Sequence, residues 1–242
     1  MSRVGQGIKV QYLIMKPGFI VFWGVILAIM AFQYLIFFYF TPQGTGVTPG
    51  VKSVVGGHLL AVVIFMGVAT GIQCWEAFPY YLNLGGTRRE FWLGCTVFNF
   101  LLSLVMAAIL VGLSLIERAV FVFFGLEHSF MFRAETIDAL IVLSTLVVNF
   151  VVIAAVAAGV FLLVSVLYRF SWKLLLVLGA AFLSGIMLFP AFNDWLFKVV
   201  EYVMLAVFDE INQETVMGGL AVFSAVCYLL AYPLLRGSQV KN

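Results

Sequence analysis

Long apolar segments separated by short polar stretches constrain the fold of this sequence more than any other feature. A helix that crosses the hydrocarbon core of a bilayer needs about 20 mostly apolar residues. Six segments meet that requirement, and they span about residues 17–40, 57–78, 91–115, 137–167, 174–191 and 216–235. Of the 242 residues, 64% are hydrophobic and 10% are charged, whereas a soluble domain is about half apolar and a quarter charged. The sequence therefore predicts an all-α integral membrane protein with one transmembrane domain over residues 1–242.

Two further segments are expected at the membrane surface. Residues 1–16 carry an apolar stripe at helical spacing, which predicts an interfacial N-terminal helix. That stripe consists of Val4, Ile8, Tyr12 and Met15. Residues 192–215 predict a short helical excursion at the outer surface before the last span. A seventh span is the alternative there, although it would bring Lys198 and Glu201 into the bilayer.

The basic residues are divided unequally between the two sets of loops and termini. One set holds Arg3, Lys9, Lys16, Arg88, Arg89, Arg169, Lys173, Arg236 and Lys241. The other set holds Lys52, Arg118, Arg133 and Lys198. Cytoplasmic loops carry an excess of Lys and Arg. The division therefore predicts that both termini are cytoplasmic.

No motif for a catalytic or cofactor site is evident in the sequence. It has no G-x-x-x-x-G-K-S/T phosphate loop, so ATP binding by that route is not predicted. His58 and His128 have no second His or Cys at ligand spacing, so neither a metal nor a haem site is predicted. Cys74, Cys95 and Cys227 lie in apolar runs and are interpreted as small buried hydrophobes. The serines within the spans have no His or Lys in a catalytic arrangement, and we expect the chain not to be an enzyme.

A few polar side chains fall inside the predicted spans. The uncharged ones are Gln33, Gln73, Asn99 and Asn149. Such residues either bond neighbouring helices together or line a transport path. Glu76 is a carboxylate within an apolar run, and ionisable residues in a span are costly and indicate function. A structural pairing of Glu76 with Arg88 or Arg89 is the alternative.

The stretch NLGGTRREFWLG, residues 83–94, joins the second and third spans. Gly85 and Gly86 allow the chain to change direction at a helix end. Thr87 is expected to cap the next helix, and Glu90, three residues later, would complete a capping box. The two arginines between them hold the turn on the cytoplasmic side, and that role alone would explain them.

The same turn resembles a cytoplasmic turn of the permease subunits of ABC-2 type exporters. That turn reads leucine, glycine, any residue, threonine or serine, two arginines, an acid and an aromatic. The order is met here by Leu84, Gly85, Gly86, Thr87, Arg88, Arg89, Glu90 and Phe91. The six-span layout with an interfacial N-terminal helix resembles the family as well. The resemblance implies that these eight residues dock on, and couple to, a separate ABC ATP-binding subunit.

The resemblance also implies the rest of the assembly. The chain would be a permease in a bacterial cell membrane, exporting an apolar or amphipathic cargo such as a peptide, toxin or drug. A second permease copy, identical or not, would complete the path, and ATP and Mg²⁺ would be bound by the partner. We also expect the chain to contact the surrounding lipid and not to bind nucleic acid. Gln33, Gln73 and Glu76 are then the candidate path residues, in a path formed mainly by the first, second and fifth spans.

Two other function classes stay open. One is a membrane assembly or sensor subunit without transport activity, which would not co-purify with an ATPase. The other, which the sequence favours less, is a lipid-modifying enzyme, which would turn over a lipid substrate by itself. The sequence does not encode the cargo or the direction of transport.

Overall fold

The computed structural model describes residues 3–40, 54–123, 139–170 and 213–237, with a few positions between 176 and 201. Every regular element within these residues is helical. Five of the described helices are long and apolar enough to cross a membrane, as expected for an all-helical membrane-embedded protein. Most of the predicted fifth span, 174–191, and most of the excursion, 192–215, lie outside the described residues.

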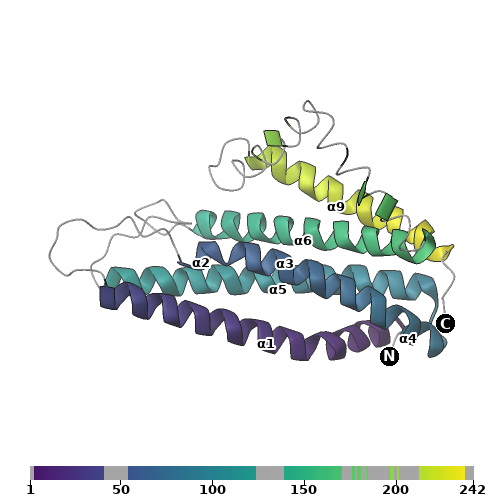
Figure 1. Ribbon diagram of the computed structural model, residues 1–242, viewed down its shortest axis with the longest axis horizontal. Coiled ribbons are helices and arrows are strands. Elements are labelled where there is room, and N and C mark those ends of the chain that lie inside the picture. The colour runs from purple at the N-terminus through teal and green to yellow at the C-terminus, as the bar shows by residue number, and fades with distance from the viewer. Residues whose placement is uncertain are drawn as a thin grey trace.

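The described helices agree in place with five of the six predicted spans. The second span is built from four consecutive pieces, of which Gln73–Ala77 is a π-helix. The elements are α1 (Arg3–Phe40), α2 (Val54–Gly57), α3 (Leu59–Ile72), η1 (Gln73–Ala77), α4 (Phe78–Asn83), α5 (Arg88–Phe123), α6 (Ala139–Phe170) and α9 (Gln213–Arg236). Figure 1 shows α6 between α9 and the layer of α3 and α5, with α1 on the other side of that layer.

The N-terminal segment differs from its prediction. Residues expected to form a separate interfacial helix are the first turns of α1, which continues through Pro17 to Phe40. Their buried side packs against α5: Gln11 is 1% exposed, and its Nε2 donates to Cys95 Sγ at 2.9 Å. Tyr12, from the predicted apolar stripe, is 53% exposed. Met15, from the same stripe, is 6% exposed, and Ile8 is partly buried against the core, so the predicted stripe coincides only in part with the buried face of α1.

The buried apolar side chains form two main clusters along the bundle. The Met66 cluster includes Met66, Met106, Leu110, Leu102 and Ile153. The Phe78 cluster includes Phe78, Phe91, Cys74, Cys95, Phe161 and Leu235. The second cluster lies toward the end of the bundle where the 84–87 turn is found.

The first turn of α1, the last turn of α9 and the 84–87 turn lie at one end of the bundle (Figure 1). Three arginines lie close together there, because the Arg88 side chain donates to the Arg236 carbonyl and the Arg169 side chain donates to the Pro233 carbonyl. We call this the basic end. Its membership agrees with the division of basic residues made from the sequence, in which these three arginines share one side of the membrane.

At the opposite end of the bundle, one carboxylate links the helices. Glu117, on α5, is 2% exposed and accepts hydrogen bonds from the Tyr34 hydroxyl at 3.0 Å and from the Val54 amide at 2.8 Å. Those donors belong to α1 and α2. A single buried carboxylate thus ties three helices together at the end farthest from the turn.

Candidate functional site

The turn between α4 and α5 has a fixed backbone conformation. α4 ends in a Schellman motif, in which the Gly85 amide donates to the Leu82 carbonyl at 3.0 Å and the Gly86 amide to the Tyr81 carbonyl at 3.1 Å. Gly85 has φ of +79°, a left-handed conformation that disfavours other residues. A Cβ added at Gly86 would lie 2.1 Å from the Tyr81 ring. The two glycines are therefore needed for different reasons, one for conformation and one for space.

The predicted capping box is present at the start of α5. The Thr87 amide donates to Glu90 Oε2 at 2.9 Å, and the Glu90 amide donates to Thr87 Oγ1 at 3.3 Å. These bonds satisfy amides that would otherwise lack a partner at the helix start. The Glu90 carboxylate is also favourably placed at the positive end of the helix dipole. Thr87 and Glu90 thus act within the turn.

Phe91 corrects one prediction made from the resemblance. It was expected to offer an apolar anchor to a partner, but its side chain is 1% exposed. Its ring lies 4.9 Å from the Phe78 ring and 6.0 Å from the Tyr81 ring. Phe91 therefore holds the turn against the bundle, and Leu84, which is 63% exposed, is the apolar side chain that the turn presents outward.

The two adjacent arginines have different environments. The Arg88 guanidinium donates to the backbone carbonyl of Arg236, the last residue of α9. A cation at a helix C-terminus satisfies a carbonyl left without an intrahelical partner and is favoured by the helix dipole. Arg89 is exposed. Arg88 therefore joins the turn to α9, while Arg89 is the arginine open to a partner.

The π-helix of the second span is explained in part by Pro79. Proline has no amide hydrogen, so the Trp75 carbonyl, four residues earlier, loses its usual helical donor. The Tyr168 hydroxyl, on α6, donates to that carbonyl at 2.7 Å. The Tyr168 ring also lies 5.0 Å from Phe78 and 5.5 Å from Trp75. Tyr168 therefore compensates for the interruption and holds this part of the span against α6.

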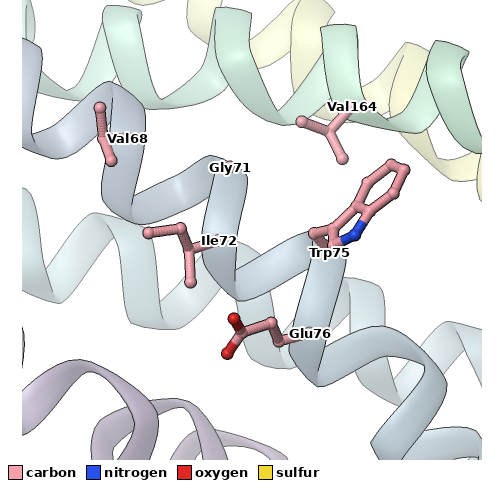
Figure 2. A pocket seen from close by; sticks show the side chains of 6 residues that line it. All are labelled: Val68, Gly71, Ile72, Trp75, Glu76 and Val164. Atoms are coloured by element: carbon pink, nitrogen blue, oxygen red, sulfur yellow. The ribbon is translucent and has the colours of Figure 1, made fainter. Parts of the chain in front are cut away.

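A groove runs beside the π-helix. It has a volume of about 360 Å³ and is lined by Val68, Gly71, Ile72, Trp75, Glu76 and Val164. Figure 2 shows Trp75 pointing toward Val164 on α6, whereas the Glu76 carboxylate projects to the other side, below Ile72. Glu76 is exposed. The structure shows no ion pair between Glu76 and Arg88 or Arg89, so the pairing considered from the sequence is not formed.

The three candidate path residues are not brought together. Gln73 begins the π-helix and is completely buried. Gln33 is exposed, and its Oε1 lies 3.2 Å from His58 Nε2. His58 precedes Gln73 by 15 residues in the second span, or about 22 Å at 1.5 Å per residue. Gln33 thus belongs to the far end, while Gln73 and Glu76 share the π-helix on different faces.

Three residues important to this arrangement were not singled out from the sequence. Glu117 was assigned to a loop because the predicted third span ended at residue 115, whereas α5 continues to Phe123. Arg169 was counted only for its charge, and Tyr168 was not considered. Pro79 is the signal for Tyr168, because a proline inside a span predicts a carbonyl four residues earlier that needs another donor. No group of three or more His, Cys, Asp or Glu suited to a metal ion occurs in the described part of the chain.

Comparison with known proteins does not assign the chain to a family. No family model, no curated protein and no solved structure matches it. The function proposed below is therefore supported by the turn, the basic end and the π-helix, together with the resemblance of residues 84–91.

Proposed function

We propose that the chain is the permease subunit of an ATP-driven exporter of the ABC-2 type, in a bacterial cell membrane with both termini cytoplasmic. Together with a second permease copy it forms the path for an apolar or amphipathic cargo. A separate ABC subunit binds ATP and Mg²⁺ and hydrolyses the nucleotide. The basic end of the bundle is then the cytoplasmic end, as the excess of Lys and Arg favours.

The observation that carries this proposal is the built turn at the basic end. A Schellman motif on one side and a capping box on the other leave the backbone between Tyr81 and Glu90 with little freedom. The buried Phe91 side chain holds this part of the backbone against the core. A flexible loop would absorb a push from a partner, whereas a turn of this kind passes the push to the helices on both sides of it.

The contacts of the turn indicate where such a displacement goes. α4 and η1 continue directly from the turn into the second span, and α5 continues from it into the third. Arg88 connects the turn to the end of α9. Movement of the turn is therefore expected to reach three helices at once, which suits a coupling element.

The π-helix is the part of the second span that changes conformation in this proposal. π-helical turns often occur at functional sites. Here Tyr168 replaces a backbone bond with a side-chain bond from α6, and the Glu76 carboxylate lies beside an apolar groove. We assign Gln73 and Glu76 to the part of the span that changes during transport, and Gln33 to the opposite end.

The two arginines allow the proposal to be tested with closely matched variants. Arg89→Ala should weaken association with the ATP-binding subunit and lower its ATPase activity, because a charged contact at an interface contributes to association. Arg88→Ala should instead lower the thermal stability of the isolated chain, because it loses its bond to α9. Lys9→Ala removes one exposed charge from α1 at the same end, outside the 84–91 segment, and is the control.

The experiment is co-purification of the tagged chain with the ABC subunit, followed by measurement of ATPase rate and cargo transport in proteoliposomes. The proposal predicts that Arg89→Ala lowers all three quantities while Lys9→Ala leaves them near the native values. Native association and ATPase rate in Arg89→Ala would contradict the docking role. Equal losses in Arg89→Ala and Lys9→Ala would show that summed charge, and not position, is what matters.

A further inference from the structure

Four polar side chains of the second and third spans are completely buried and make no hydrogen bond of good geometry with the residues that the structure describes. Thr70, Gln73, Asn99 and Ser103 are each 0% exposed. Both amide atoms of Gln73 and Asn99, and the hydroxyl oxygens of Thr70 and Ser103, make no hydrogen bond among the described residues. Other span serines differ: Ser165 donates to the Phe161 carbonyl at 2.7 Å.

The four side chains share one level of the bundle. Cys74 and Cys95 interact with each other where the second and third spans meet. Thr70 precedes Cys74 by one helical turn, with Gln73 beside it, and Asn99 and Ser103 follow Cys95 by one and two turns on the same face. Because the two spans are antiparallel, both sets lie on the same side of the cysteine contact, away from the 84–87 turn.

This level lies where the two main apolar clusters adjoin. Cys74 and Cys95, on its one side, belong to the Phe78 cluster. Met66 and Met106, on its other side, belong to the Met66 cluster. The four polar groups thus share one level of the bundle, at which Ala69, Phe98 and Leu102 of the Met66 cluster also lie.

The chemistry of the layer is uncharged and has both donors and acceptors. Two carboxamides and two hydroxyls supply them. Lipid cannot hydrogen-bond to such groups, so leaving them unpaired in a bilayer is costly. The Tyr228 hydroxyl, on α9, lies within hydrogen-bonding reach of the Asn99 side chain, although neither amide atom of Asn99 has a hydrogen bond in good geometry among the described residues.

We propose that Thr70, Gln73, Asn99 and Ser103 form an internal water-binding layer between the second and third spans. Water fits this set because a buried water needs two to four polar partners and can act as donor and acceptor at once. Gln73 is also the first residue of the π-helix, so the water lies where the helical ladder of the second span changes. The layer does not depend on the permease proposal, since it is a property of the isolated chain.

Thiol reactivity tests this layer, because the thiolate is the reactive form and an apolar site suppresses it. In a chain whose three native cysteines are replaced by alanine, Thr70→Cys and Ser103→Cys would be treated with methyl methanethiosulfonate, a small neutral reagent. Met66→Cys and Met106→Cys, on the same two spans and equally buried, are the controls. A hydrated layer predicts modification about tenfold faster, or more, at positions 70 and 103 than at 66 and 106. Equal rates at all four positions would overturn the proposal and leave the four groups as direct links between helices.

A second variant asks whether the amides hold the water. Adding Gln73→Leu and Asn99→Leu to the Ser103→Cys chain removes the two carboxamides with little change of volume. The rate at position 103 should then fall toward that of the Met106→Cys control, with the variant still eluting as a folded particle in detergent. An unchanged rate in that folded variant would contradict the proposal. If the double replacement does not fold, the comparison of positions 70 and 103 with their controls decides alone.

Discussion

Removal of the Tyr168 hydroxyl should destabilise the bundle through a single backbone carbonyl. Tyr168→Phe keeps the ring, and so keeps the contacts at 5.0 Å with Phe78 and 5.5 Å with Trp75. It removes only the donor to the Trp75 carbonyl, which now lies 2.7 Å away. Hydrogen bonds measured inside membrane proteins are worth about 0.6 kcal/mol on average and reach about 1.7 kcal/mol. Because Pro79 leaves this carbonyl no helical donor, we expect a loss of about 1 kcal/mol.

Pro79 provides the double-mutant cycle. Pro79→Ala restores an amide that can donate to the Trp75 carbonyl, so the Tyr168 hydroxyl becomes redundant. Tyr168→Phe should therefore cost about 1 kcal/mol in the native chain and only about 0.3 kcal/mol in the Pro79→Ala chain, a coupling that such cycles resolve. The control is Tyr12→Phe on the exposed face of α1, which should change the unfolding free energy little.

The assay is equilibrium unfolding in mixed micelles, followed by the circular dichroism of the helices. An equal cost of Tyr168→Phe in both backgrounds would refute the link to Pro79. A cost near zero in the native chain would show that the Tyr168 bond contributes nothing to stability.

Three further predictions concern the turn and its location. Gly86→Ala should destabilise the chain by about 1–3 kcal/mol, because its Cβ would overlap the packed Tyr81 ring at 2.1 Å. Gly85→Ala should cost about 1 kcal/mol, because Gly85 has a φ of +79°. Thermal unfolding would compare the two variants, and a larger loss for Gly85→Ala would contradict the packing argument. Thr87→Ala should lose the cap and about 1 kcal/mol, measured in the same assay, with Thr87→Ser near the native value. A Gly237→Cys chain should not react with an impermeant thiol reagent on intact cells, and labelling there would contradict the cytoplasmic terminus.

The sequence was sufficient for the features that depend on local chemistry. Five of the predicted spans appear as helices because runs of about 20 apolar residues leave few other folds in a bilayer. The capping box followed from Thr87 and Glu90, three residues apart. The basic end followed from the distribution of Lys and Arg, and Arg88, Arg169 and Arg236 do lie together.

Features that depend on which helix faces pack against each other could not be predicted from the sequence. The apolar stripe of residues 1–16 included Tyr12, which is exposed, because an apolar face can meet lipid as well as protein. Phe91 was assigned to a partner because a sequence does not tell whether an aromatic side chain at a helix start packs inward or outward. Glu117 was placed in a loop, although bonds from Tyr34 and Val54 make its burial favourable.

The π-helix depends both on local chemistry and on which helix faces meet. Pro79 was not used in the sequence analysis; it is a signal for an interruption of the second span, but not for which group compensates for it. The donor comes from Tyr168, 93 residues away in the chain. Gln73 was recognised as a polar residue within a span, yet its lack of a hydrogen-bond partner among the described residues became evident only when both helices around it were placed.

Site-specific cross-linking tests the docking role of the turn most directly. A photoreactive phenylalanine analogue would be placed at Leu84 or at Arg89, both exposed at the basic end, and at Phe123, which is 84% exposed at the opposite end of α5. The proposal predicts a covalent adduct with the ABC ATP-binding subunit from positions 84 and 89, and none from position 123. Absence of an adduct from both turn positions, in membranes where the two subunits are present together, would contradict it.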